Sequence, residues 1–111
     1  MINTSLSNIG IWELVEPGVR RKVFEPGASL MMMEVHFEAG AQSAEHSHPH
    51  EQMTYCMKGL FRFVIDGKAY ELNAGKALNI PAGAVHSARA LAPGVLLDTF
   101  TPVREDIVRT V

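Results

Sequence analysis

The chain has 111 residues, with ten basic and twelve acidic side chains and a net charge of -2 at pH 7. This length is typical of one domain, and the charge lacks the basic excess of nucleic-acid-binding proteins. A single cysteine excludes an intrachain disulfide framework and a cysteine-rich zinc site. No apolar run approaches the ~20 residues that span a membrane, and the N-terminal MINTSLSNIG does not resemble a signal peptide. We therefore expect one cytoplasmic domain, residues 1–111, that binds neither nucleic acid nor membranes.

Short apolar or alternating runs, separated by glycine and proline, follow one another along the chain, and none sustains a helical period. They predict nine strands, at residues 11–16, 19–24, 30–37, 52–58, 60–65, 68–72, 76–80, 85–91 and 95–101. Asp66-Gly67 predicts a hairpin, because a type I′ turn needs positive φ. The polar stretch 41–51 is compatible with a loop, and 104–111 is too short to assign. This spacing predicts an all-β barrel or sandwich.

Three of the five histidines, His46, His48 and His50, lie close together in the sequence. Alternation along an extended segment points His46 and His48 to one side, where two imidazoles can share a metal ion. A solvated histidine-rich loop would explain the same residues without a metal. Because Pro49 interrupts the run, we expect His50 at the rim of the site, with a substrate contact as the alternative.

These histidines belong to a longer pattern with two halves, at residues 40–59 and 75–90. The first half reads G-x5-H-x-H-x3-Q-x6-G, and the second contains G-x5-P-x-G-x2-H, which ends at His86. The pattern resembles the two motifs of the cupin superfamily, and the resemblance covers residues 30–101. It implies a single-domain double-stranded β-helix, or jelly roll, with one divalent metal ion held by His46, His48, Gln52 and His86.

Gln52 stands where the cupin family usually has glutamate, and Ala90 where it often has asparagine. Three neutral imidazoles and a carboxamide leave the full charge on the ion, which makes it a stronger Lewis acid toward an anionic ligand. The alternative is an interior Gln52 that makes only hydrogen bonds. The donor set does not select among nickel, zinc, iron, manganese and cobalt.

Other reactive side chains have structural interpretations. His36 shares a strand face with Glu34 and Glu38, and we expect it to bond to these carboxylates. Cys56 is expected to be an inert interior thiol. The methionine run 31–33 predicts core or dimer packing.

Asp98 interrupts an apolar strand and shares a face with Phe100. A buried carboxylate needs a partner, and an ion pair with Arg104 is one interpretation. The other makes Asp98 a general acid/base that faces the cavity, with Phe100 as a wall and Arg104 as a clamp for an anion.

The segment HSHPHEQ, followed later by DTFTPVRED, resembles the KdgF-type cupins of pectin degradation. The resemblance implies an enzyme that opens the ring of 4,5-unsaturated uronates, a class of small anionic sugar, to linear ketouronates. It assigns the metal and cavity roles to His46, His48, Gln52, His86, Asp98, Phe100 and Arg104. Two alternatives stay open: a quercetinase-like dioxygenase, which would usually have glutamate at Gln52, and a non-catalytic module that binds a small molecule.

The N-terminal segment carries more apolar side chains than a small barrel can readily bury: Ile9, Ile11, Trp12, Leu14 and Val15. We expect residues 1–29 to contact a second copy of the chain in a homodimer, which would also protect a sheet edge. The alternative is that this segment folds back over its own barrel.

Overall fold

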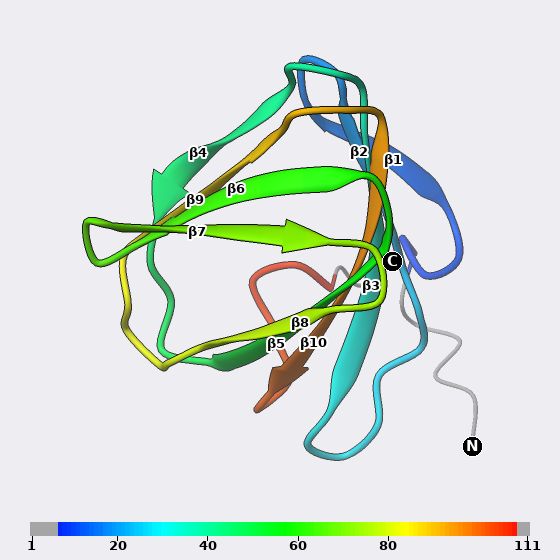
Figure 1. Ribbon diagram of the computed structural model, residues 1–111. Helices are drawn as coiled ribbons and strands as arrows, with labels where there is room; N and C mark the ends of the chain where they lie inside the picture. The colour runs from blue at the N-terminus through cyan, green and yellow to red at the C-terminus, as the bar shows by residue number, and fades with distance from the viewer. Residues whose placement is uncertain (1–6, 109–111) are drawn as a thin grey trace.

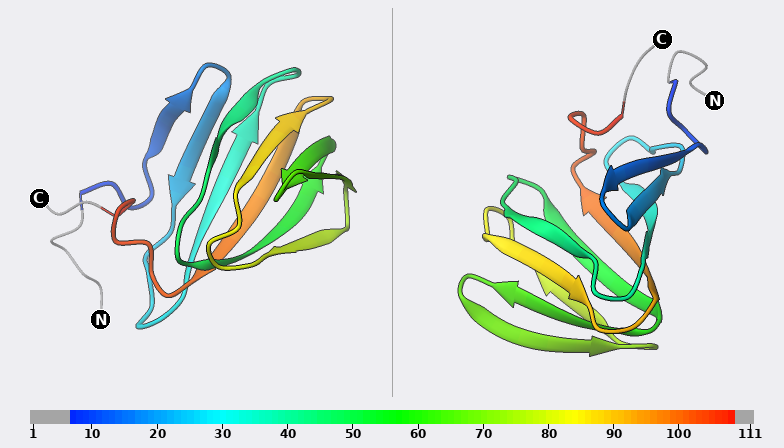
Figure 2. Two further views of the ribbon diagram at one scale, coloured as in Figure 1. Left: turned by 90° about the vertical axis from the view of Figure 1, so that its left-hand side faces the viewer. Right: turned by 90° about the horizontal axis from the view of Figure 1, so that it is seen from above.

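The computed structural model describes residues 7–108 as two antiparallel β-sheets that face each other (Figures 1 and 2). The six-stranded sheet contains, in spatial order, β1 (Trp12–Glu16), β2 (Val19–Val23), β3 (Met31–Phe37), β10 (Gly94–Thr101), β5 (Glu51–Lys58) and β8 (Ala77–Ile80). The four-stranded sheet contains β4 (Gln42–His46), β9 (His86–Ala90), β6 (Leu60–Ile65) and β7 (Lys68–Asn73). The jelly roll expected from the sequence is confirmed. Within 7–108, no helix has the length and apolar character needed to cross a membrane.

The core fills the space between the two sheets, because alternate residues of each strand point inward. In β3, Met31 and Met33 are 3% and 8% exposed, whereas Met32 between them is 40% exposed on the outer face. Phe37 of the same strand meets Phe61 of the opposite sheet with ring centroids 5.1 Å apart. The methionine run therefore contributes two core residues and one surface residue.

Two turns show why glycine is needed at particular positions. Asp66 and Gly67 have φ of 48° and 80°, which confirms the predicted hairpin between β6 and β7. Gly59 joins β5 to β6 with φ of 93°, and a Cβ atom there would lie 2.7 Å from the carbonyl oxygen of Pro93. Only glycine fits at position 59 without moving the neighbouring backbone.

Strand β4 is absent from the sequence prediction, which allowed a loop over 41–51. Its residues are mostly exposed, so it lacks the apolar alternation that identifies a strand. Pairing with β9 places His46 opposite His86. Both carboxylate oxygens of Glu16, in β1, accept hydrogen bonds from the backbone N–H of Ala44, at 3.0 and 3.1 Å. Tertiary contacts therefore hold this polar strand in place.

Strand β1 extends the six-stranded sheet beside β2 and does not cover the barrel (Figure 2). Ile11 and Leu14 are 54% and 78% exposed, so the alternative of a fold-back is wrong for these residues. It holds for Ile9, which packs against the core and forms a bridge with Val23. Residues 1–6, part of the predicted dimer contact, lie outside the described residues.

Candidate functional site

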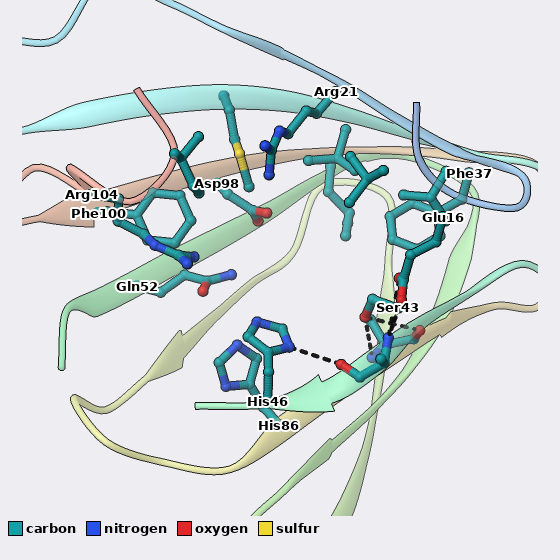
Figure 3. A pocket seen from close by; sticks show the side chains of 18 of the residues that line it. Glu16, Arg21, Phe37, Ser43, His46, Gln52, His86, Asp98, Phe100 and Arg104 are labelled. Atoms are coloured by element: carbon teal, nitrogen blue, oxygen red, sulfur yellow. Dashed lines mark hydrogen bonds between the residues drawn. The ribbon is translucent and has the colours of Figure 1, made fainter. Parts of the chain in front are cut away.

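Three imidazoles converge at one end of the space between the sheets. His46 ends β4, His48 follows it in the connection to β5, and His86 begins β9. One ring nitrogen of each lies within 4.8 Å of the other two. The register of β4 and β9 brings the rings of His46 and His86 to a centroid distance of 4.3 Å (Figure 3). The structure therefore brings together the three predicted histidine ligands.

Backbone carbonyls select one tautomer in all three rings. The Nδ1 atoms lie 2.8, 3.0 and 2.9 Å from the carbonyl oxygens of Ala44, His50 and Ala84, for His46, His48 and His86 respectively. A carbonyl only accepts hydrogen bonds, so each neutral ring carries its proton on Nδ1 and a lone pair on Nε2. The Nε2 atom of His86 is buried and has no hydrogen-bond partner among residues 7–108.

Burial also keeps two of these rings neutral. Desolvation lowers the pKa of His86 to about 4 and is the main cause of a lowered pKa at His48. Metal ligation requires neutral imidazole, so both rings are ready to bind a cation at neutral pH.

The side chain of Gln52 lies beside the three histidines. Its Oε1 atom lies 3.0 Å from Nε2 of His48, which bears a lone pair in the tautomer just described. Donor atoms about 2.1 Å from one ion lie roughly 3–3.5 Å from one another, so a cation between these two acceptors would satisfy both. The residues therefore fit a divalent ion held by three nitrogens and one oxygen. Gln52 as a ligand stays a prediction.

A chain of hydrogen bonds leads from Gln52 to Asp98. Gln52 Nε2 donates to Thr54 Oγ1 at 2.8 Å, and Thr54 Oγ1 donates to Asp98 Oδ1 at 2.7 Å. Asp98 is 6% exposed, and burial raises the pKa of its carboxyl to about 6. The ion pair with Arg104, one of the two interpretations of the sequence, does not occur among the described residues. The sequence analysis assigned no role to Thr54, although Thr54 lies two residues after Gln52 on the same face of β5.

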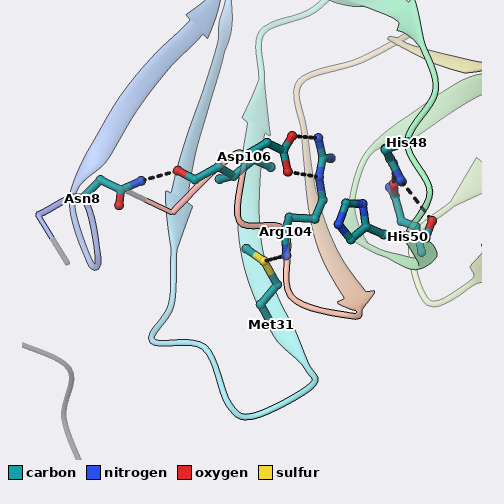
Figure 4. Close-up of polar contacts among 8 residues, drawn as sticks. Asn8, Met31, His48, His50, Arg104 and Asp106 are labelled. Carbon is teal, nitrogen blue, oxygen red and sulfur yellow. Dashed lines mark hydrogen bonds and ion pairs between the residues drawn. The ribbon is translucent and has the colours of Figure 1, made fainter. Parts of the chain in front are cut away.

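Arg104 is held by its own segment of chain. Its Nε and Nη2 atoms donate to the two carboxylate oxygens of Asp106, at 3.3 and 2.6 Å (Figure 4). Its guanidinium carbon lies 5.0 Å from the ring centroid of Phe100, which is 1% exposed. Arg104 lines the cavity as expected, but Asp106 already occupies two of its donors. That restraint was invisible in the sequence, because it depends on the turn that follows β10.

Three other side chains considered from the sequence, His50, His36 and Cys56, do not belong to the histidine cluster. His50 lies outside the three-histidine cluster, and its carbonyl oxygen fixes the tautomer of His48. His36 bonds to Glu34 at 2.5 Å, as predicted for a sheet histidine. Cys56 is fully buried, and burial raises the pKa of its thiol, which confirms an interior cysteine.

A cavity of about 370 Å³ opens beside the histidine cluster, a volume within the range of small-molecule sites. Its polar lining includes His46, Gln52, His86, Asp98, Arg104, Glu16 and Arg21. Asp98, Phe100 and the two arginines lie on one side, and His46 and His86 lie across from them (Figure 3). Sequence reasoning missed Arg21, although its signal was present: Arg21 alternates with Val19 and Val23, which are both buried.

Comparison with known proteins agrees with this architecture. The family model of the cupin domain matches residues 33–100. The pectin degradation protein KdgF of Dickeya dadantii (strain 3937) is 37% identical over 99 residues, which make up 87% of this chain and 90% of that protein.

Two solved structures are also similar over nearly their whole length. KdgF from Halomonas sp. superposes with a TM-score of 0.82 at 36% identity, over 86% of this chain and 89% of that one. An RmlC-like cupin from Shewanella frigidimarina superposes with a TM-score of 0.84 at 31% identity, over 95% of this chain and all (100%) of that one. The chain therefore belongs to the cupin family and is a relative of KdgF.

Proposed function

We propose that this protein opens the ring of 4,5-unsaturated uronates to linear ketouronates during pectin degradation. The observation that carries the proposal is the buried carboxyl of Asp98, which faces a sugar-sized cavity across from three converging imidazoles. The similarity to KdgF, named as a pectin degradation protein, supports the substrate class.

The reaction is an isomerisation and needs no oxidant. The anomeric hydroxyl loses its proton as C1–O1 becomes a carbonyl, and the C1–O5 bond breaks with its electron pair moving to O5. O5 then belongs to an enolate at C5, which becomes a ketone when C4 takes up a proton. A divalent ion at His46, His48, Gln52 and His86 would supply Lewis-acid stabilisation of negative charge developing on oxygen.

Asp98 is the group that we assign to the proton transfers. A pKa near 6 lets its carboxylate accept the proton of the anomeric hydroxyl and later deliver a proton to C4. Thr54 donates to Oδ1 and so fixes the orientation of the carboxyl, leaving Oδ2 for the substrate. The buried ring of Phe100 forms the adjacent wall and keeps water from the carboxyl.

Arg104 is the group that we assign to the substrate carboxylate. Asp106 fixes the plane of its guanidinium, and the remaining nitrogen, Nη1, is available to an anion in the cavity. A guanidinium held in one orientation loses less conformational entropy when it binds.

The proposal is tested by incubating metal-loaded protein with unsaturated galacturonate and following the loss of absorbance of its conjugated double bond. We expect a rate well above the spontaneous one, with no oxygen consumed. A rate equal to the spontaneous one contradicts the proposal. Oxygen uptake would support a dioxygenase instead, and binding without turnover would support a sensing module.

A further inference from the structure

Arg21 occupies a position that packing alone would assign to an apolar residue. It lies on the inner face of β2, between Val19 and Val23, which are 3% and 0% exposed. Its guanidinium enters the cavity from the same side as Asp98 and Arg104 (Figure 3). Removing an arginine from water is unfavourable unless a partner compensates the charge.

Among the described residues, Arg21 has one ion-pair partner. Its Nε atom lies 3.5 Å from Oε1 of Glu13, which is a long distance for a hydrogen bond, and its two Nη atoms have no hydrogen-bond partner within 7–108. Burial, followed by the charge of Arg104, lowers the pKa of Arg21, and the carboxylate of Asp106 opposes this effect only in part. Two guanidiniums thus approach each other on one wall of the cavity, where a single anion could neutralise the repulsion between them.

We infer that Arg21 and Arg104 together bind the carboxylate of the ligand, and that this pair makes the cavity selective for uronic acids over neutral sugars. The inference deepens the proposed function and rests on it for the sugar. Arg104 offers Nη1, and Arg21 offers both Nη atoms, so a carboxylate between them would receive hydrogen bonds from the middle of β2 and from the turn after β10. Arg21 would then contribute to ligand selection and take no part in the proton transfer.

A structural role explains these facts less well. The neighbouring Arg20 is an example of a surface arginine on the same strand. Its side chain is exposed on the outer face of the sheet, and its guanidinium carbon lies 5.2 Å from the ring centroid of Trp12. Arg20 and Arg21 therefore form a matched pair on one strand, with the same side chain on opposite faces of the sheet.

The experiment measures binding of two unreactive probes, D-galacturonate and its methyl ester, to the metal-loaded protein by calorimetry. The ester has nearly the same shape without the charge. We expect Arg21→Gln to weaken galacturonate binding by about ten- to a hundredfold, the usual loss for a charge-assisted hydrogen bond, and to leave ester binding unchanged. Arg21→Lys should recover part of the loss, and Arg20→Gln should behave as the wild type.

Four results would overturn the inference: unchanged galacturonate binding in Arg21→Gln, equal weakening of both probes, an equal loss in Arg20→Gln, or no preference of the wild type for the acid. The metal content and thermal melting of each variant are measured as controls for the site and the fold. If Arg21→Gln does not fold, the comparison is made with Arg21→Lys. Turnover of unsaturated galacturonate is measured separately. A wild type that binds galacturonate through Arg21 but turns nothing over would contradict the proposed function and leave this inference standing.

Discussion

At Asp98, the needs of stability and of the proposed chemistry oppose each other. Burial raises the pKa of its carboxyl to about 6 from 3.8, so the folded protein binds this proton more tightly than the unfolded chain. Stability from this group is therefore complete below pH 3.8 and is lost as pH rises through about 6. At neutral pH the ionised, buried carboxylate destabilises the fold.

We expect Asp98→Asn to be inactive, to keep its metal, and to be more stable than the wild type at pH 8 by roughly 1–3 kcal/mol. The amide oxygen can still accept the hydrogen bond from Thr54, while no charge is buried. Thermal melting of the metal-free proteins at pH 8 and pH 3.5 checks this, since the gain should disappear in acid. A variant that melts below the wild type at pH 8, or that remains active, contradicts the expectation.

His86 produces the opposite pH dependence. Burial lowers its pKa to about 4 from 6.5, so between these pH values His86 is mostly protonated in the unfolded chain and mostly neutral in the folded protein. Its contribution is complete above pH 6.5 and is lost as pH falls through about 4. We expect the metal-free wild type to lose roughly 2–3 kcal/mol more stability across this range than His86→Gln, measured by urea unfolding at several pH values. Equal losses in the two proteins would show that His86 is not the buried neutral base described above.

At the scale of elements, the tight connection from β5 to β6 can be tested by adding one methyl group. Gly59 and Gly75 both have positive φ, of 93° and 86°. A Cβ atom at Gly59 would meet the backbone of Pro93 at 2.7 Å, whereas none of the surrounding atoms lies within 4 Å of one at Gly75. Alanine at Gly75 should cost about 1–2 kcal/mol for the backbone conformation alone, and alanine at Gly59 at least about 1 kcal/mol more. Chemical denaturation of both variants checks this, and equal losses would contradict the role of the close contact.

The elements also show where sequence reasoning was sufficient. Apolar alternation located nine of the strands, with each end within one residue of its observed position, because a strand with one buried face carries an apolar residue at every second position. The same reasoning missed β4, whose side chains are mostly exposed and which depends on β9 and Glu16 for its position. Since β4 carries His46, the missed strand is the one that aligns a predicted ligand with His86.

At the scale of the whole molecule, the outer face of the six-stranded sheet exposes a group of apolar side chains. Met32 and Met53 flank Thr99 across three neighbouring strands, and Tyr55 and Met57 continue the group along β5. Met53, Tyr55 and Met57 are 46%, 43% and 49% exposed. Leu14 on β1, at the far edge of the same sheet, is 78% exposed. Groups of exposed apolar side chains of this kind often mark interaction surfaces.

We propose that a second copy of the chain covers this face. Sedimentation at micromolar concentration should give the mass of a homodimer. The double variant Met53→Glu, Met57→Glu should be a monomer, because dimerisation would bury two unpaired carboxylates in the interface. Metal binding of the double variant should be unchanged, since both side chains point away from the cavity. A monomeric wild type contradicts the proposal.

Local patterns in the sequence were enough to predict the all-β class, the turn at Asp66-Gly67 and the three histidines that converge in the candidate site. These features depend on local rules: alternation along a strand, φ at a turn, and the spacing of ligands within two short motifs. Which polar side chains meet depends instead on the arrangement of the strands in space. Thr54, Asp98 and Arg21 come from β5, β10 and β2, so their convergence depends on strand order and register, which join residues far apart in the sequence. For the same reason, the buried Asp98 is paired with Thr54, 44 residues away. Arg104 and Asp106 are close in the sequence, but the turn after β10 decides that they meet.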